Sequence, residues 1–107
     1  MGKELEKEVE GYLEKQVTAN GGWSAKFISV NLRGVPDRII SFPHTGPLFV
    51  ELKRLGEKPR PQQVYRINEM RKYGCSVLVV DTKEKVDRLI EELMKSKHTH
   101  KKGDNGK

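Results

Sequence analysis

The sequence predicts a single α/β domain in which one small, mixed β-sheet is flanked by helices. Its length of 107 residues is close to the commonest domain size, roughly 100–150 residues, and allows one modest core. Apolar residues recur with helical or strand-like spacing in the order helix, strand, strand, strand, helix, strand, helix. The helix between the last two strands leaves room for a right-handed parallel crossover, whereas turns join the first three strands. These observations together predict a mixed sheet.

The N-terminal half contains the first helix and three consecutive strands. Apolar residues at helical spacing predict a helix over residues 3–19, and Asn-Gly-Gly at 20–22 predicts its end. Pro36 cannot donate a ladder hydrogen bond, so the second strand is expected to begin directly after it. The turn Pro-His-Thr-Gly-Pro at 43–47 predicts a hairpin between the second and third strands. The three strands are predicted at residues 23–30, 37–42 and 48–53.

The C-terminal half is predicted to hold a helix, a buried strand and a last helix. The first of these helices is expected over residues 61–73, after a proline-rich loop. The continuous apolar run at 76–80 is typical of a strand that is buried on both faces. The last helix is predicted over 83–95. Because no apolar pattern follows it, we expect one folded domain at 1–94 and a basic, disordered tail at 95–107.

Composition and charge narrow the class of protein. No run approaches the roughly 20 apolar residues of a membrane span, and no signal peptide is visible, so we expect no membrane partner. Cys75 is the only cysteine, which excludes an intramolecular disulfide and indicates an intracellular location. Residues 26–72 carry ten Lys or Arg against four Asp or Glu. A basic segment favours a phosphate-backbone partner, although many proteins with basic surfaces bind no nucleic acid.

Three charged residues stand within the otherwise apolar second and third strands. Because side chains alternate along a strand, Glu51 and Lys53 share one face of the third strand. A hairpin that turns near residues 44–46 places Asp37 opposite residue 52 or 53, beside this pair. The simplest interpretation is a surface ion pair, which contributes only about 0–1 kcal/mol.

The same residues also suit the hydrolysis of a phosphodiester. Asp37, Glu51 and a backbone carbonyl, with Leu52 the obvious candidate, offer the oxygen ligands that Mg²⁺ or Mn²⁺ prefers. Such an ion polarises a phosphate and lowers the pKa of a bound water. Lys53 could orient the attacking water or stabilise charge on the phosphate oxygens. The residues alone leave both interpretations open.

Five blocks of the sequence resemble those of one nuclease family. They are the Gly-Gly pair after the first helix, GVPDR, VELK, KPRPQQ and YGCSVLVVD. Their order over residues 4–93 is similar to that of the stand-alone VRR-NUC nucleases of phages and bacteria, within the PD-(D/E)xK superfamily. The resemblance implies a restriction-endonuclease-like core and cleavage of branched DNA, such as Holliday junctions or flaps. It also implies one or two Mg²⁺ or Mn²⁺ ions, no nucleotide cofactor, a homodimer, and action in a bacterial cytoplasm, with a phage as one source of such enzymes.

Carried over by position, the resemblance assigns four catalytic residues outside the first helix. Asp37 matches the metal-binding aspartate, Glu51 the second carboxylate and Lys53 the lysine of the family motif. Gln63, early in the helix after the proline-rich loop, matches a glutamine of the VRR-NUC site. Gln62 is the preceding residue, so the choice between the two glutamines depends on where this helix begins.

The first helix supplies one more carboxylate in the family, and two residues compete for that role. Glu6 and Glu10 are four residues apart and lie on one helical face. The spacing to the Gly-Gly pair matches the family better for Glu10, so Glu10 is the expected residue and Glu6 the alternative. The resemblance implies that this glutamate acts in catalysis and reaches the metal, directly or through a water.

The expected function is therefore a metal-dependent endodeoxyribonuclease. Six basic residues that flank the motif are expected to contact DNA phosphates. They are Lys26, Arg33, Arg38, Arg54, Lys58 and Arg60. A non-catalytic DNA-binding module that keeps the nuclease fold is the alternative, although two carboxylates repel DNA unless a cation intervenes. A hydrolase of another phosphoester is less favoured, because the basic segment suits a polyanion better than a small ester.

Overall fold

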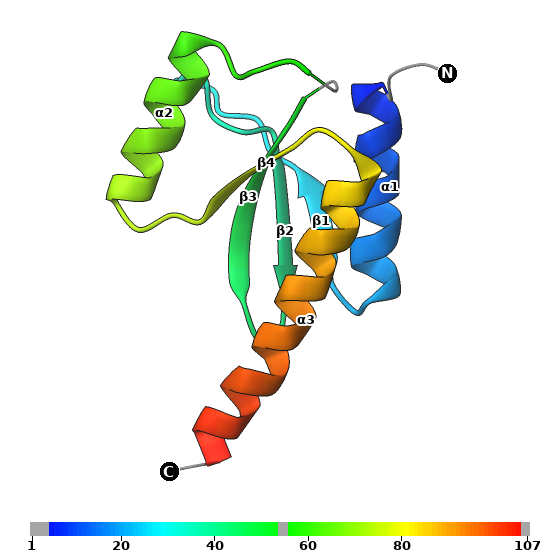
Figure 1. Cartoon of the computed structure of the whole chain (residues 1–107). Helices are drawn as coiled ribbons and strands as arrows, with labels where there is room; N and C mark the ends of the chain where they lie inside the picture. Colours follow the sequence, from blue (N-terminus) through cyan, green and yellow to red (C-terminus); the bar gives the residue numbers. More distant parts are fainter. Residues whose placement is uncertain (1–4, 54–55, 106–107) are drawn as a thin grey trace.

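The computed structural model describes residues 5–53 and 56–105. Helices and strands follow one another in the order that the sequence predicts (Figure 1). The helices are α1 (Glu6–Ala19), α2 (Pro61–Lys72) and α3 (Lys83–Asn105). The strands are β1 (Trp23–Lys26), β2 (Arg38–Phe42), β3 (Gly46–Leu52) and β4 (Val77–Val80). The predicted α/β class with its single mixed sheet is confirmed.

The four strands form one sheet in the order β1-β2-β3-β4. The pairs β1–β2 and β2–β3 are antiparallel, whereas β3 and β4 are parallel and are connected through α2. In Figure 1, α1 and α3 lie on one side of the sheet and α2 lies on the other. The result is a three-layer α/β/α arrangement, because the two faces of the sheet are covered by different helices.

The main core lies between the sheet and the α1–α3 pair. Strand alternation directs the even-numbered residues of β2 and β3 to this face, and α1 and α3 contribute apolar stripes at helical spacing. The buried cluster consists of Val9, Leu13, Val17, Ile40, Phe42, Leu48, Val50, Leu52, Val80, Val86 and Ile90. The odd-numbered strand residues therefore face α2, and this is the face that carries Glu51.

Gly22 shows how closely α1 approaches the sheet where the helix ends. Its N–H donates to the carbonyl of Val17 at 2.8 Å, which closes the turn after the helix. A Cβ atom at position 22 would lie 2.7 Å from side-chain carbons of both Val17 and Phe42. Only glycine fits such an approach, so the Gly-Gly pair of the sequence does more than end the helix.

Three details differ from the sequence-based expectations. β1 ends at Lys26 instead of residue 30, and the residues that follow form a loop. β4 is not buried on both faces: it is an edge strand, and Val79 is 38% exposed. An apolar run cannot distinguish an edge strand from a central one, because the difference depends on sheet order.

The third difference concerns the C-terminal segment. α3 continues to Asn105, whereas the sequence analysis expected this helix to end at residue 95; the disorder of the tail stays a prediction. Lysine has good helix propensity, and extending an existing helix adds a hydrogen bond for each residue ordered. A helix can therefore continue without an apolar stripe, and the end of α3 projects past the sheet in Figure 1. The assignment of residues 1–94 as the functional domain stays a prediction.

None of the helices in the described part of the chain combines the length and the hydropathy that crossing a membrane requires.

Candidate active site

The β2–β3 hairpin brings Asp37 and Glu51 to the same end of the sheet. Arg38 pairs with Val50 in the ladder, so continuing the register by one residue sets Asp37 beside Glu51. The expected position of Asp37, opposite residue 52 or 53, is therefore wrong. Only three unpaired residues form the turn, which shifts the pairing relative to that expectation. In this register Asp37 lies directly opposite Glu51, so the two carboxylates are closer together than the sequence suggested.

Asp37 is held by backbone contacts while its side chain stays accessible. The N–H of Phe27 donates to the carbonyl of Asp37 at 2.9 Å and extends the β1–β2 pairing past the end of β1. The preceding Pro36 is buried, whereas Asp37 itself is exposed. The aspartate thus stands at the end of a well-anchored strand with its carboxylate open to solvent.

Glu51 and Lys53 lie on one side of the chain at the end of β3, as strand alternation predicts, and they form an ion pair that is buried. Their exposed fractions are 6% and 8%, and Lys53 Nζ lies 3.7 Å from Glu51 Oε2. Gln63 Nε2 donates to the same Glu51 oxygen at 2.9 Å. Gln63 Oε1 in turn accepts the backbone N–H of Arg60 at 2.8 Å, which orients the amide at the start of α2. Between the two adjacent glutamines, Gln63 contacts Glu51 and Gln62 is exposed.

The environment of Glu51 disfavours its charged form. Burial raises the pKa of this carboxyl from 4.5 to about 7, and it is the largest cause. The positive charge of Lys53 lowers the pKa, whereas the negative charges of Asp37 and Glu6 raise it. Desolvation thus outweighs the lysine. A group that is buried, negatively charged and close to other carboxylates would be stabilised by a bound cation.

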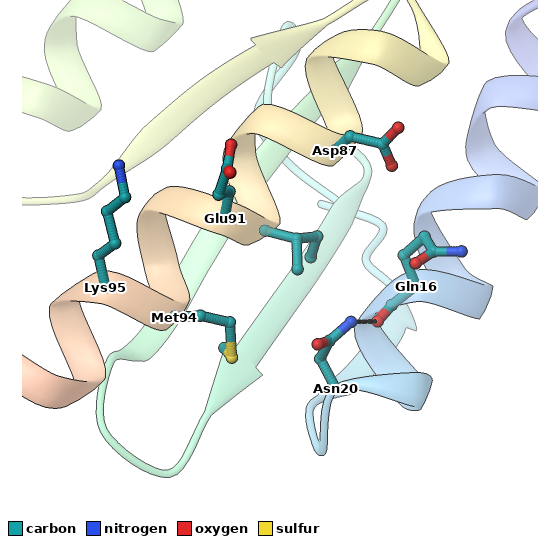
Figure 2. A pocket seen from close by; sticks show the side chains of 7 residues that line it. Gln16, Asn20, Asp87, Glu91, Met94 and Lys95 are labelled. Atoms are coloured by element: carbon teal, nitrogen blue, oxygen red, sulfur yellow. Dashed lines mark hydrogen bonds between the residues drawn. The ribbon is translucent and has the colours of Figure 1, made fainter.

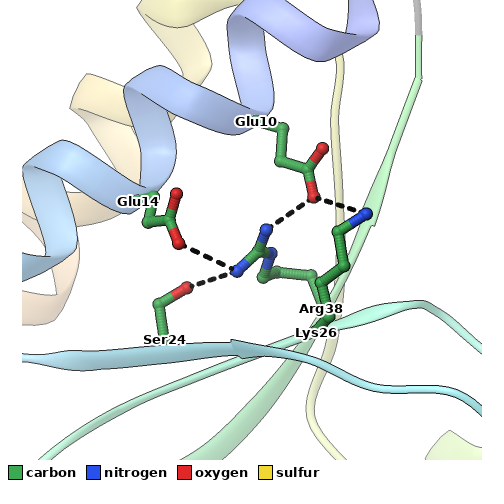
Figure 3. Close-up of polar contacts among 5 residues, drawn as sticks. All are labelled: Glu10, Glu14, Ser24, Lys26 and Arg38. Carbon is green, nitrogen blue, oxygen red and sulfur yellow. Dashed lines mark hydrogen bonds and ion pairs between the residues drawn. The ribbon is translucent and has the colours of Figure 1, made fainter.

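Glu10 is held on the other face of the sheet by Arg38 (Figure 3). Arg38 is 4% exposed, and its Nη2 donates to Glu10 Oε2 at 2.6 Å. Its Nη1 donates to Ser24 Oγ at 3.1 Å and lies 3.5 Å from Glu14 Oε2. Lys26 Nζ is 3.9 Å from the same oxygen of Glu10. The prediction that Arg38 contacts DNA is therefore wrong, because this residue joins α1 to the sheet from a buried position.

Glu6, the alternative first-helix carboxylate, lies toward the Glu51 end of the sheet. It is the first residue of α1, and its charge acts on Glu51. Glu10 lies one turn further along and is occupied by Arg38. The sequence shows that both residues lie on one helical face. It does not show that Arg38 binds Glu10, because these two residues are 28 positions apart.

The other predicted DNA-contacting residues are accessible wherever the structure describes them. Lys26, Arg33, Lys58 and Arg60 are all exposed, and Arg54 lies outside the described residues. The β1–β2 loop approaches the start of α2, since Arg66 Nε donates to the carbonyl of Arg33 at 2.8 Å. Exposed basic residues from two loops therefore gather at the end of the sheet that carries Glu51.

The residues at this end fit a hard divalent cation in chemistry, although the carboxylates are not gathered into a complete ligand set. Among the side chains that the structure describes, in residues 5–53 and 56–96, no group of three or more His, Cys, Asp or Glu is close enough to hold a metal. Asp37 and Glu51 supply two carboxylates, and the carbonyl of Leu52 is adjacent. Burial is the main reason why the pKa of Glu51 is raised, and repulsion from Asp37 and Glu6 adds to it; a bound cation would offset both effects. Oxygen donors of this kind match Mg²⁺ and Mn²⁺.

A hollow of about 510 Å³ lies elsewhere, between α1 and α3 (Figure 2). Gln16 and Asn20 line it from the C-terminal part of α1, whereas Glu6 stands at the opposite end of that helix. Asp87 and Glu91 line it from α3. Asp87 and Glu91 are exposed carboxylates that would repel a phosphate, and no buried lysine like Lys53 accompanies them. This hollow is therefore a separate feature from the candidate site.

Comparisons with known proteins agree with the fold and with a nuclease function. No family model matches the chain. The chain is 38% identical over 79 residues to "Putative nuclease p44" of Acyrthosiphon pisum secondary endosymbiont phage 1, across 74% of this chain and 85% of that protein. A solved structure described as "VRR_NUC domain" is similar with a TM-score of 0.75 and 34% identity. That match covers 80% of this chain and 94% of the solved chain.

Proposed function

The chain belongs to the VRR-NUC family of nucleases, and from that premise we propose that it is a divalent-metal-dependent endonuclease that cleaves branched DNA. One observation carries the proposal. Glu51 and Lys53 are buried together on one face of β3, Gln63 donates to Glu51, and the strand register sets Asp37 beside them. A surface ion pair would not be expected to bury both charges and to raise the pKa of the carboxyl.

Asp37, Glu51 and the Leu52 carbonyl are the groups that would hold Mg²⁺ or Mn²⁺. When bound, one or two such ions would polarise the scissile phosphate and supply a water of lowered pKa. Gln63 keeps the Glu51 carboxylate in place through its 2.9 Å hydrogen bond. Lys53 balances the negative charge of Glu51, 3.7 Å away, and its ammonium group would stabilise negative charge that develops on the phosphate oxygens.

We assign the first-helix carboxylate of the site to Glu6 in place of Glu10. Glu6 acts electrostatically on Glu51, whereas Glu10 is 2.6 Å from the buried guanidinium of Arg38. Glu6→Gln is expected to lower the cleavage rate at least about tenfold, as loss of an outer ligand does. Glu10→Gln is expected to act mainly on stability. The reverse pattern of activities would return the role to Glu10.

Branched DNA and a homodimer complete the proposal. The exposed basic loops beside Asp37 support binding to a polyanion. Symmetric cleavage of a four-way junction needs two active sites, and one chain supplies one.

β4 is a sheet edge, and edge strands pair readily with another chain. We also infer action inside a bacterial cell, because the single cysteine of the sequence, Cys75, cannot form an intramolecular disulfide. Light scattering that reports only monomers would make flaps or nicks the better substrates.

The experiment that tests the proposal compares cleavage of duplex, flap, replication-fork and four-way-junction DNA. Wild-type protein is expected to cleave branched substrates with Mg²⁺ or Mn²⁺ and to stop when EDTA is added. Asp37→Asn should bind the same DNA without cleaving it. Glu91→Gln, which removes an exposed carboxylate from the hollow between α1 and α3, is the matched control and should cleave normally. Cleavage by Asp37→Asn in EDTA would refute the proposal.

The alternative, a DNA-binding module without catalysis, makes a different prediction. Such a module has no reason to bury two partly compensated charges beside an exposed aspartate. It should bind branched DNA but bind no Mn²⁺ at millimolar concentration in a calorimetric titration. That result, together with the absence of cleavage on every substrate, would favour the alternative.

A further inference from the structure

The loop between β1 and β2 exposes apolar side chains directly beside the candidate active site. Ile28 is 80% exposed, Val30 is 97% exposed and Leu32 is 48% exposed. They alternate with polar residues in a segment with strand-like sequence that leaves the sheet after Lys26. Large aliphatic side chains at three alternate positions of one loop indicate contact with something outside the chain.

This loop is anchored at its base and along one side. The bond from Phe27 N–H to the Asp37 carbonyl, 2.9 Å, joins its two ends. Within the loop, the N–H of Leu32 donates to Ser29 Oγ at 3.2 Å. Further along, Arg66 Nε donates to the carbonyl of Arg33 at 2.8 Å. These hydrogen bonds fix the conformation of the loop that carries the exposed apolar side chains.

Gly34 makes the contact between this loop and α2 possible. Its φ angle is +80°, and a Cβ atom there would lie 2.7 Å from the carbonyl oxygen of Gln62. Glycine alone permits both the backbone conformation and the approach. The loop is thus seated against the first turn of α2, next to the residue that holds Glu51. Its position relative to the candidate site is set by the fold.

Charge indicates which partner fits the loop. Lys26 and Arg33 flank the apolar residues, and both are exposed. A two-fold contact between copies of this chain would bring these like charges together, which disfavours that occupant. A nucleic acid offers phosphates for the basic residues and base faces for the aliphatic ones. Because Asp37 closes the base of the loop, this partner is the same molecule on which the site would act.

We propose that Ile28 and Val30 form an apolar wedge that enters the DNA at a branch point and contacts unstacked bases. Aliphatic side chains that insert between base steps unstack them and bend the duplex. Unstacking is easiest where pairing is already interrupted, so the wedge would favour branched over continuous DNA. This inference rests on the proposed nuclease function, and it assigns the recognition of the branch to two residues outside the catalytic set.

The test uses the double variant Ile28→Ser with Val30→Ser in the full chain. Both side chains are exposed, so the fold should be retained, as circular dichroism can verify. The variant is expected to cleave flap and four-way-junction DNA at least about tenfold more slowly than wild type. The matched control is Tyr73→Ser, an exposed apolar residue at the far end of α2, which should cleave as wild type does.

A second readout separates failure of the wedge from failure of the nuclease proposal. Branched DNA with 2-aminopurine at the branch point is titrated with each protein in EDTA. Wild type and Tyr73→Ser should increase the fluorescence as the base unstacks, whereas the double variant should bind without that increase. If wild type unstacks the base but cleaves nothing with Mg²⁺ or Mn²⁺, the nuclease proposal fails and the wedge stands. Equal fluorescence and equal cleavage by the double variant would overturn the wedge, as would conversion of a dimer to a monomer by the two substitutions.

Discussion

Replacing Glu51 by glutamine should remove a specific pH dependence from the stability of the metal-free protein. Burial raises the pKa of Glu51 from 4.5 to about 7 in the folded chain. Between these two values the folded state binds a proton that the unfolded state has released. The free energy of unfolding therefore falls as the pH rises through this window. One pKa unit corresponds to about 1.4 kcal/mol, so the group accounts for a fall of about 3 kcal/mol.

The assay is urea unfolding in EDTA, followed by circular dichroism at several pH values from 4.5 to 8. The quantity of interest is the unfolding free energy of wild type minus that of Glu51→Gln, because groups common to both proteins cancel. This difference should fall by about 3 kcal/mol across the window. Glu91→Gln, at an exposed position of α3, should show no such trend relative to wild type.

Adding Mg²⁺ should reduce the pH dependence that Glu51 causes. A cation beside the carboxylate favours its charged form and lowers its pKa, so the folded protein releases the extra proton on binding. A difference between wild type and Glu51→Gln that stays constant within about 0.5 kcal/mol from pH 4.5 to 8 would refute the reasoning. The carboxyl would then be solvated as an ordinary surface glutamate is.

Two further predictions concern residues that support the site. Glu10→Gln should lower the free energy of unfolding by about 2–3 kcal/mol in urea, because it weakens the closest partner of the buried Arg38 guanidinium, 2.6 Å away. Glu14→Gln should lower it by less than about 1 kcal/mol, since that side chain is 55% exposed and 3.5 Å from Arg38; equal losses would show that Glu10 is not the main partner. Gln63→Ala should lower kcat for DNA cleavage by about 10–100-fold with little change in KM, because Glu51 loses an orienting donor. Gln62→Ala should leave kcat within about twofold of wild type, and a larger effect there than at Gln63 would reverse the assignment of the two glutamines.

Local periodicity was sufficient to predict the central part of the candidate site. Strand alternation placed Glu51 and Lys53 on one face, and the turn residues placed Asp37 in the partner strand. Both features depend only on neighbours in sequence or on a short hairpin. The exact pairing of Asp37 was wrong, because it depends on how many residues the turn leaves unpaired.

Features that depend on tertiary contacts could not be predicted in the same way. Arg38 lies in a basic segment and was expected on the surface, but Glu10 and Glu14 from α1 bury it. The contact between Arg38 and Glu10, which supports our proposal of Glu6 over Glu10, also joins residues that are 28 positions apart. The exposed face of Val79 depends on β4 being the last strand of the sheet. In each case the exposure or contact of the residue depends on an element that is distant in the sequence. Local sequence patterns do not show which element that is.

The claim that Asp37 and Glu51 form a metal centre is tested most directly by crystals of the wild-type protein soaked in Mn²⁺. Anomalous diffraction locates Mn²⁺ independently of any assumption about activity. We predict a peak between the carboxylates of Asp37 and Glu51, next to the Leu52 carbonyl. A fully occupied peak elsewhere, such as between Asp87 and Glu91 in the hollow of Figure 2, with none at Asp37 and Glu51, would contradict the account.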